Sequence, residues 1–400
     1  MRHRCSPQLR RLAAAGRGAR ADLVTIAAVA AAVVWANVSP GSYAAIWHAI
    51  VPSAHVLGHD LTLRDLVSQG LMVLFFLLVG LEIRREIAGG DLRSWRRASA
   101  PLLAAAFGMA VPALLYALIA GATSGGGGWG IPMATDVAFA LGALGLVQPG
   151  SSRLRVFLLT LAVADDIASI AILILFYSQR VDVALVGVSL ACLGAIIALA
   201  AVRRRGEARG MWPLVVLGIP AWWALARAGI EPAVLGVAIG VIAPSLARPR
   251  SGGDASSGLE WALAPWVTLV VLPAFALANA GVPLTGSVLG SGAAARIFLA
   301  VALARFVGKP LGITVGQRVA ALGRAPPDRW SIPFRHEVGL GAVASIGLTV
   351  PLLIIRAALP AGPLANAAIA GLLAGSLAGG VAGAWLLRIP RPKPSVTRDR

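Results

Sequence analysis

The sequence has 400 residues, of which 58% are hydrophobic and only 13% are charged. A soluble domain carries about 25% charged residues, so this composition excludes an ordinary soluble protein. The net charge of +18 does not indicate a nucleic-acid partner, because the arginines stand in short loops between apolar stretches, where they set membrane topology. The two cysteines, Cys5 and Cys192, stand in a basic tail and in an apolar stretch, and they predict neither a disulfide nor a metal site.

Apolar stretches long enough to cross a bilayer recur along the chain. Twelve are predicted as transmembrane helices, so the predicted fold class is an all-α polytopic membrane protein. A membrane domain over 23–388 would lie between basic tails, 1–22 and 389–400. The first stretch resembles a signal peptide, but the eleven that follow favour an uncleaved anchor. The predicted spans are 23–38, 66–83, 99–121, 129–147, 154–178, 183–202, 211–227, 231–247, 260–281, 294–316, 336–357 and 363–387.

Lysine and arginine residues divide unevenly between the two sides of these predicted helices. The two tails and the loops on their side hold 28 of them, and the opposite side holds five. Positively charged loops stay in the cytoplasm, so both termini are predicted there, and an even number of spans agrees. We therefore expect a multi-pass protein of a bacterial inner membrane, surrounded by the lipid bilayer.

Two adjacent aspartates, Asp165 and Asp166, lie near the middle of the span 154–178. A charge at the bilayer centre costs at least about 2.5–3.5 kcal/mol, so the pair requires a reason. Neighbouring carboxylates in a low dielectric do not both ionise cheaply, and they tend to hold protons until a hard cation replaces them. Sodium fits this role, because hard cations prefer oxygen ligands. The structural alternative is a pair that caps a helix end or is neutralised by an arginine.

Two spans contain residues that interrupt a helix. Pro132 precedes Thr135 and Asp136 in the fourth span, and small residues with Ser345 and Pro351 weaken the eleventh. Backbone groups freed by such breaks are tolerated only where protein or a water-filled cavity satisfies them. Interrupted spans in corresponding positions of two halves indicate an inverted-repeat transporter with its site at the midplane. Capping of the second half-helix by Thr135 and Asp136 is an alternative that is compatible with this role.

Lys309 is one of only two lysines among 35 basic residues, and it lies inside a span, one turn after Arg305. A buried lysine can lose its proton, whereas arginine stays charged. A group that releases a proton or changes partners suits a proton-coupled site. The alternative is a purely structural counter-ion for Asp165 or Asp136. For Arg305, contacts with other polar groups or with an interface are left open.

Six motifs in this order resemble the NhaA-type sodium/proton antiporters. Each motif is short, but together they follow the family's order across about residues 23–388. The motifs are FFLLVGLEIRRE at 75–86, PMATDVAFALG at 132–142, ADD at 164–166, FALANAG at 275–281, GKPLG at 308–312 and SIGLT at 345–349.

The resemblance implies exchange of one Na⁺ or Li⁺ for two protons, with inward proton flow driving sodium outward for sodium and pH homeostasis. It implies no cofactor, and inverted repeats are a known property of this family. Na⁺ and H⁺ are the expected partners, and a homodimer is left open. The implied roles are cation and proton binding for Asp165 and Asp166, a place at the crossing of interrupted helices for Thr135, Asp136 and Lys309, and pH response for Glu82, Glu86 and Glu260.

Two departures from the family pattern, at three positions, leave the pH set point open. Ser68 and Gln69 stand where the family often has Asn-Asp, and Glu231 stands where some members have histidine.

Other functions that use buried aspartates fit the sequence less well. An intramembrane aspartyl protease would need a Gly-x-Gly-Asp signature, which is absent. A membrane prenyltransferase would need Asp-Asp-x-x-Asp, but the residues after Asp166 are Ile167, Ala168 and Ser169. We therefore expect a transporter and not an enzyme. A channel or a paralogue that does not exchange ions remains an alternative.

Overall fold

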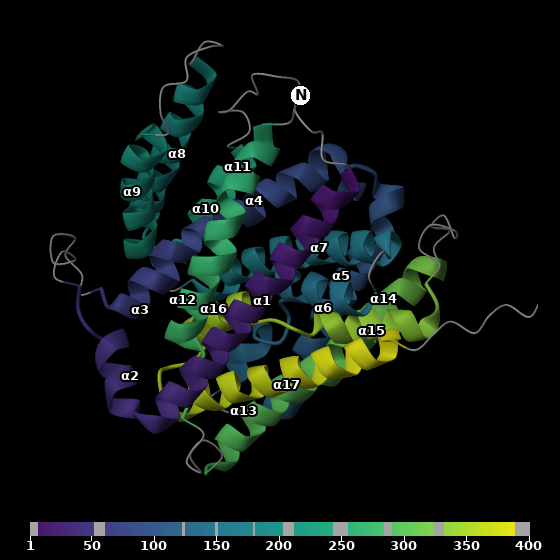
Figure 1. The fold of residues 1–400 in the computed structure, drawn as a ribbon. Coiled ribbons are helices and arrows are strands. Elements are labelled where there is room, and N and C mark those ends of the chain that lie inside the picture. Colours follow the sequence, from purple (N-terminus) through teal and green to yellow (C-terminus); the bar gives the residue numbers. More distant parts are fainter. Residues whose placement is uncertain are drawn as a thin grey trace, which may run out of the picture.

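The computed structural model describes residues 7–51, 61–121, 125–148, 151–178, 181–202, 212–242, 255–283, 290–322 and 332–388. Within these ranges the secondary structure is helical, apart from one isolated antiparallel bridge between Ile50 and Thr62 (Figure 1). This agrees with the predicted all-α class. The predicted C-terminal tail, 389–400, lies outside the described residues, as does Cys5.

Six described helical segments are long and apolar enough to cross a bilayer, or eight if each of two bent helix pairs counts as one span. Each of the twelve predicted ranges overlaps a helix, but three apolar helices are shorter than a full crossing by this criterion, and α10 (Val234–Ile242) is shorter still. The six segments are Leu63–Gly89, Arg97–Ala120, Arg153–Tyr177, Ala262–Asn279, Gly292–Leu322 and Pro363–Arg388.

The first helix begins earlier than predicted. Helix α1 spans Pro7–Val38, so it starts within the segment expected to be a basic tail. After Val38 the chain turns by 118° into α2 (Pro40–Trp47). Pro40 stands at the start of α2, where proline favours helix initiation because its fixed φ suits the first turn.

Three of the long segments contain a π-helical stretch between two α-helices. A π-helical turn is wider than an α-helical one, and such turns are frequent at functional sites. The stretch η8 (Ala304–Gly308) matters most here, because it directly precedes Lys309. The three runs are α3 (Leu63–Asp65), η2 (Leu66–Leu71) and α4 (Met72–Gly89); α11 (Ala255–Trp266), η6 (Val267–Val271) and α12 (Leu272–Asn279); and α13 (Gly292–Leu303), η8 and α14 (Lys309–Leu322).

Two short non-helical segments, 131–136 and 345–348, meet inside the molecule, and we call them the crossing segments. The first separates η4 (Gly126–Gly130) from α6 (Val137–Val147). The second separates α15 (Phe334–Ala344) from α16 (Thr349–Ala358), whose axes differ by 55°. The backbone N–H of Asp136 donates to the carbonyl of Ile346 at 2.9 Å, which ties the segments together.

Helices from distant parts of the sequence surround the crossing segments. Helix α7 (Ser152–Tyr177) contacts α6 and α15, while α14 packs against both α5 (Trp95–Ala120) and α15. Helices α13 and α17 (Pro363–Arg388) run side by side (Figure 1). The pair α8 (Val183–Val202) and α9 (Trp212–Arg227) lies at the edge of the molecule, away from the crossing segments (Figure 1).

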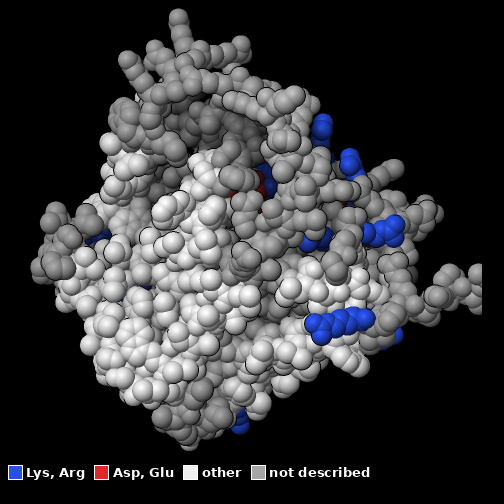
Figure 2. Space-filling model, in the orientation of Figure 1, with Lys and Arg blue, Asp and Glu red and all other residues white. Residues whose placement is uncertain are grey.

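The surface is apolar where a soluble protein would be polar. Leu118, Leu175 and Leu377 are 72%, 76% and 70% exposed, and many other large apolar side chains are exposed as well, as on a surface that faces lipid. In Figure 2 most of the described atoms are uncharged, and most of the visible lysine and arginine atoms lie on the right half of the view, where α14 and α17 end. This distribution fits a protein that spans a membrane.

Candidate functional site

Asp165 lies on α7 and is fully buried beside the first crossing segment. Its Oδ2 accepts a hydrogen bond from the backbone N–H of Thr135 at 2.7 Å. The ammonium of Lys309, itself 1% exposed, donates to the two carboxylate oxygens at 2.9 and 3.1 Å. A buried ion pair is stable only when hydrogen bonds of this quality compensate the loss of solvation. Helices α7 and α14 therefore meet through a charged pair in the interior.

Asp166 follows on the same helix and is 4% exposed. Adjacent helical residues point about 100° apart, so Asp166 faces a different direction from Asp165. It makes no hydrogen bond within the described part of the chain, but it interacts electrostatically with Asp165, Asp136 and Glu82. Its oxygens are therefore available to a proton or a cation.

Thr135 and Asp136 connect the two crossing segments through their side chains. The Thr135 hydroxyl donates to the carbonyl of Ala344 at 2.9 Å, and the Thr349 hydroxyl donates to Asp136 Oδ2 at 3.2 Å. Asp136 occupies the residue before α6 but makes no side-chain capping hydrogen bond there. The capping alternative is therefore not supported by a capping hydrogen bond of Asp136, whose side chain accepts a hydrogen bond from Thr349 at the start of α16. Sequence analysis did not select Thr349 as a site residue, although it closes the motif at 345–349.

Lys309 has a second partner besides Asp165. Its ammonium donates to the carbonyl of Met133, in the first crossing segment. Between the two carboxylates proposed as its counter-ions, the structure selects Asp165, since no ion pair joins Lys309 to Asp136 among the described residues. The lysine thus contacts both the aspartate pair and the end of a backbone segment.

Arg305 is a second buried cation, which sequence analysis left without an assigned partner. It is 0% exposed, and its Nε and Nη2 donate to the carbonyl of Ser345 at 2.9 and 2.6 Å. Nη2 also donates to the carbonyl of Ala134 at 3.1 Å. Of the alternatives left open, contacts with other polar groups are the ones observed. The sequence signal for this residue is the presence of an arginine inside an apolar span.

The three glutamates expected to respond to pH gather near the end of α4, apart from the aspartate pair. Glu86 is buried and accepts from the Asp91 backbone N–H at 2.8 Å and from the Thr160 hydroxyl at 3.1 Å. Glu260 pairs with Arg85 at 2.6 Å. Glu82, on the same face of α4 as Glu86, interacts electrostatically with Glu260 and with Asp166. It therefore links this cluster to the pair.

A separate polar cluster lies at the opposite end of the segment Leu63–Gly89. Arg356 pairs with Asp65 at 2.6 Å and donates to Ser68 at 2.6 Å and to Asn279 at 3.1 Å. Ser68, one of the positions that depart from the family pattern, is thus part of an ion-pair network. Glu231, the other departure, lies in the turn between α9 and α10, and its buried Oε1 has no hydrogen-bond partner within the described residues.

The chain is similar to known proteins over most of its length. The family model described as "Na+/H+ antiporter 1" matches residues 14–387. A protein of Acidovorax sp. (strain JS42) named Na⁺/H⁺ antiporter NhaA is 40% identical over 92% of this chain and 89% of its own length. Proteins of the same name from Granulibacter bethesdensis and, as NhaA 2, from Myxococcus xanthus are 36% and 37% identical over 93% and 92% of this chain and 94% and 87% of their own lengths. The chain belongs to the NhaA family of Na⁺/H⁺ antiporters, which are secondary transporters and not enzymes.

Proposed function

We propose that this protein exchanges Na⁺ for H⁺ across a membrane, with Asp165 and Asp166 as the groups that bind the two ions in turn. The observation that carries the proposal is the position of Asp165, a buried carboxylate held by Lys309 and by the Thr135 backbone beside the first crossing segment. Asp166 adds a second buried carboxylate without a hydrogen bond within the described residues. Carboxylate oxygens bind either a small hard cation or a proton, so the two ions compete for the same atoms.

Competition at one site explains how uptake and release are coupled. On the side where Na⁺ is bound, the cation replaces a proton at Asp166 and the Lys309 ammonium at Asp165. Rearrangement of the crossing segments then exposes the site to the other side, where protons displace the cation. Because the same oxygens hold either ion but not both, neither ion crosses without the other.

Lys309 adds a constraint to this cycle. Its ammonium occupies both Asp165 oxygens, so a cation that binds Asp165 must displace it. The ammonium has a carbonyl partner at Met133, and a lysine, unlike an arginine, can give up its proton in a buried site. Either response removes the positive charge from Asp165 when the cation arrives. Lys309 is thus the counter-ion of Asp165 before the cation binds, and it takes part in the exchange when the cation arrives.

The finer features of the function follow from the family and from the charge distribution. We propose twelve crossings as inverted repeats in a bacterial inner membrane, with both termini in the cytoplasm. Two protons per Na⁺ or Li⁺ are released when Asp166 and the Lys309 ammonium each give up one, and this ratio moves net positive charge inward. A membrane potential that is negative inside would accelerate such a cycle and drive Na⁺ outward, which serves sodium and pH homeostasis.

The test measures proton flux in everted membrane vesicles on addition of Na⁺ or Li⁺. Asp165→Asn and Asp166→Asn remove a titratable oxygen while keeping the shape of the side chain, so each variant is expected to lose the cation-dependent signal. Asp182→Asn is the matched control, because Asp182 is exposed at the start of α8, where asparagine also accepts the hydrogen bonds of Ala184 and Leu185.

Three outcomes separate the alternatives. Full exchange in either site variant would exclude the assigned carboxylates. Flux of Na⁺ without counter-movement of protons would indicate a channel. Absence of any cation-dependent flux in the unmodified protein would indicate a paralogue that does not exchange ions.

A further inference from the structure

Arg305 is a buried charge that the proposed exchange cycle does not use. Its guanidinium is 0% exposed, and no carboxylate lies within ion-pair distance of it among the described residues. Arginine stays protonated in proteins, so this charge cannot be removed by loss of a proton. A buried charge is costly unless hydrogen bonds compensate it. The partners of the guanidinium therefore indicate what it does.

Both partners of Arg305 are backbone carbonyls, one in each crossing segment. Ser345 follows the last residue of α15, where carbonyls have no partner within the helix and the helix dipole is negative. Ala134 lies next to Thr135, whose N–H holds Asp165. One rigid guanidinium thus joins the end of α15 to the backbone segment that positions the Asp165 carboxylate.

The packing around Arg305 leaves room for this guanidinium and for little else. A Cβ at Gly347 would collide with Arg305 Nη2 and would lie 2.7 Å from the Ala134 carbonyl oxygen. A Cβ at Gly375, on α17, would lie 3.1 Å from Arg305 Cβ. Gly347 therefore permits the close approach of the two crossing segments and the guanidinium.

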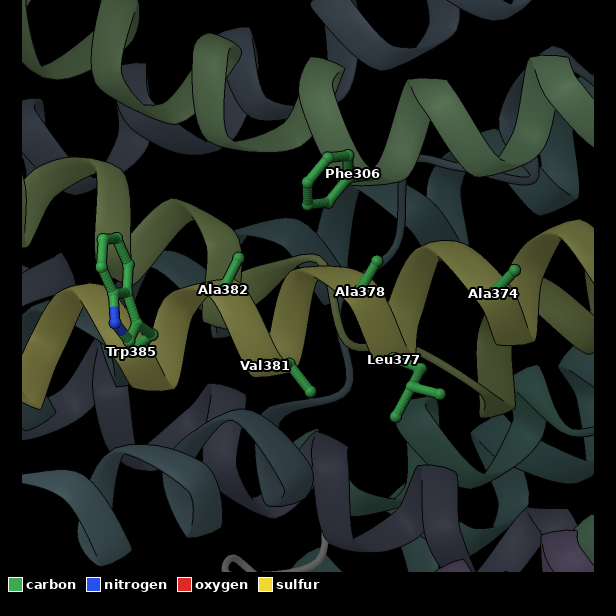
Figure 3. Close-up of a pocket in the computed structure, with 7 residues that line it drawn as sticks. All are labelled: Phe306, Ala374, Leu377, Ala378, Val381, Ala382 and Trp385. Carbon is green, nitrogen blue, oxygen red and sulfur yellow. The ribbon is translucent and has the colours of Figure 1, made fainter.

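Arg305 lies within the π-helical stretch η8 and faces the interior. Arg305 is fully buried, whereas the next residue, Phe306, is 40% exposed and borders an apolar surface groove of about 600 Å³. Figure 3 shows Phe306 in this groove, facing Ala378 and Ala382 of α17. Four residues after Arg305, Lys309 is buried again. The wider turn of η8 thus accompanies two inward cations on one span, and such turns are frequent at functional sites.

We infer that Arg305 is a positioning residue for the exchange site, whose fixed charge holds the two crossing segments together while Lys309 changes partners. This inference rests on the proposed function. The Lys309 ammonium leaves the Asp165 carboxylate when Na⁺ binds, whereas the Arg305 guanidinium keeps its hydrogen bonds. When the ammonium leaves, the guanidinium still compensates the carbonyls of Ala134 and Ser345. Thr135 therefore keeps its place against Asp165, and the oxygens remain arranged for the incoming cation.

The first test replaces Arg305 by lysine and measures the Na⁺ dependence of exchange in everted vesicles. Arg305→Lys keeps the charge but loses the planar fork that reaches two carbonyls. We expect the KM for Na⁺ to rise about tenfold, which corresponds to about 1.4 kcal/mol. Arg296→Lys, at an exposed position of the preceding α13, is the matched control and should keep the KM.

The second test leaves Arg305 in place and displaces it. Gly347→Ala puts a methyl group against Nη2 and the Ala134 carbonyl, so the KM for Na⁺ should rise as in Arg305→Lys. Gly187→Ala is its control, since nothing lies within 4 Å of a Cβ at that position of α8. KM does not depend on the amount of protein in the membrane, so both variants remain informative if less protein accumulates.

The outcomes distinguish this inference from the function on which it rests. A purely structural Arg305 would lower the amount of protein and the maximal rate without changing KM. An unchanged KM in both Arg305→Lys and Gly347→Ala, together with loss of exchange in Asp165→Asn, would overturn the positioning role and leave the proposed function intact. Exchange that persists in Asp165→Asn would instead refute the proposed function.

Discussion

The Lys309 ammonium divides its hydrogen bonds between the Asp165 carboxylate and the Met133 carbonyl. Both members of the ion pair are almost fully buried. Breaking a buried pair by removal of one partner leaves a charge without compensation, which is more costly than removal of both. The stability of the protein is therefore coupled to the group that the cation must displace during exchange.

Lys309→Met is expected to destabilise the protein by about 3–5 kcal/mol, because Asp165 would lose its counter-ion inside the protein. Thermal unfolding of the purified protein in detergent measures the effect. The double variant Lys309→Met with Asp165→Asn removes both charges and should regain a large part of the loss. Additive effects of the two substitutions would show that the pair is not coupled in this way.

For individual residues, the sequence identified the aspartates and Lys309 but not the contacts between them. A charge in an apolar span is visible in the sequence because its insertion is costly. The partner of Arg305 is not visible, because backbone carbonyls carry no sequence signal of their own. The hydrogen bond from the Thr349 hydroxyl to Asp136 is not visible either, because the two residues lie far apart in the chain.

At the scale of helices, glycines at every fourth position let α14 lie directly on α5. A Cβ at Gly308 would lie 3.0 Å from the Cα of Pro112, and Cβ atoms at Gly312 and Gly316 would collide with the carbonyl oxygens of Phe107 and Leu103. Small residues at this spacing let membrane helices approach closely, where packing replaces the hydrophobic effect. This contact fixes the helix that begins with Lys309.

Gly312→Ala is expected to push α14 away from α5 and to cost about 1–3 kcal/mol, as overpacking of a close contact does. The displacement also moves Lys309, so the exchange rate should fall together with the unfolding temperature. Both quantities are compared with those of Gly187→Ala, whose added methyl group meets no neighbour within 4 Å. Equal stability and equal exchange in the two variants would rule out this packing role.

At the scale of the whole molecule, polar clusters occupy the two ends of the segment Leu63–Gly89. Asp65 pairs with Arg356 at one end, and Glu86 accepts hydrogen bonds at the other. The 21 helical steps between them span about 32 Å, close to the thickness of the bilayer's hydrocarbon core. This separation is the one expected for clusters at the two surfaces of a membrane.

The proposed orientation predicts which surface faces outward. In a background with Cys5→Ser and Cys192→Ala, Gly292→Cys reports on the start of α13 and Gly89→Cys on the end of α4. Both positions are exposed, and a Cβ at either meets no described residue within 4 Å. A thiol reagent that does not cross membranes should label Gly292→Cys in intact cells and Gly89→Cys in everted vesicles. The opposite pattern would place the termini outside.

Hydropathy, the arginine distribution and the lone lysine in a span determined the membrane class, the approximate helical ranges and four of the five charged residues of the site, all except Arg305. These features are encoded locally, because lipid imposes a cost on every polar group that enters it. The tertiary structure decided that Lys309 pairs with Asp165, that Arg305 joins the two crossing segments and that Asp136 is bound by Thr349. Those contacts join residues far apart in the chain, and only the packing of α7, α14 and the crossing segments brings them within hydrogen-bonding distance.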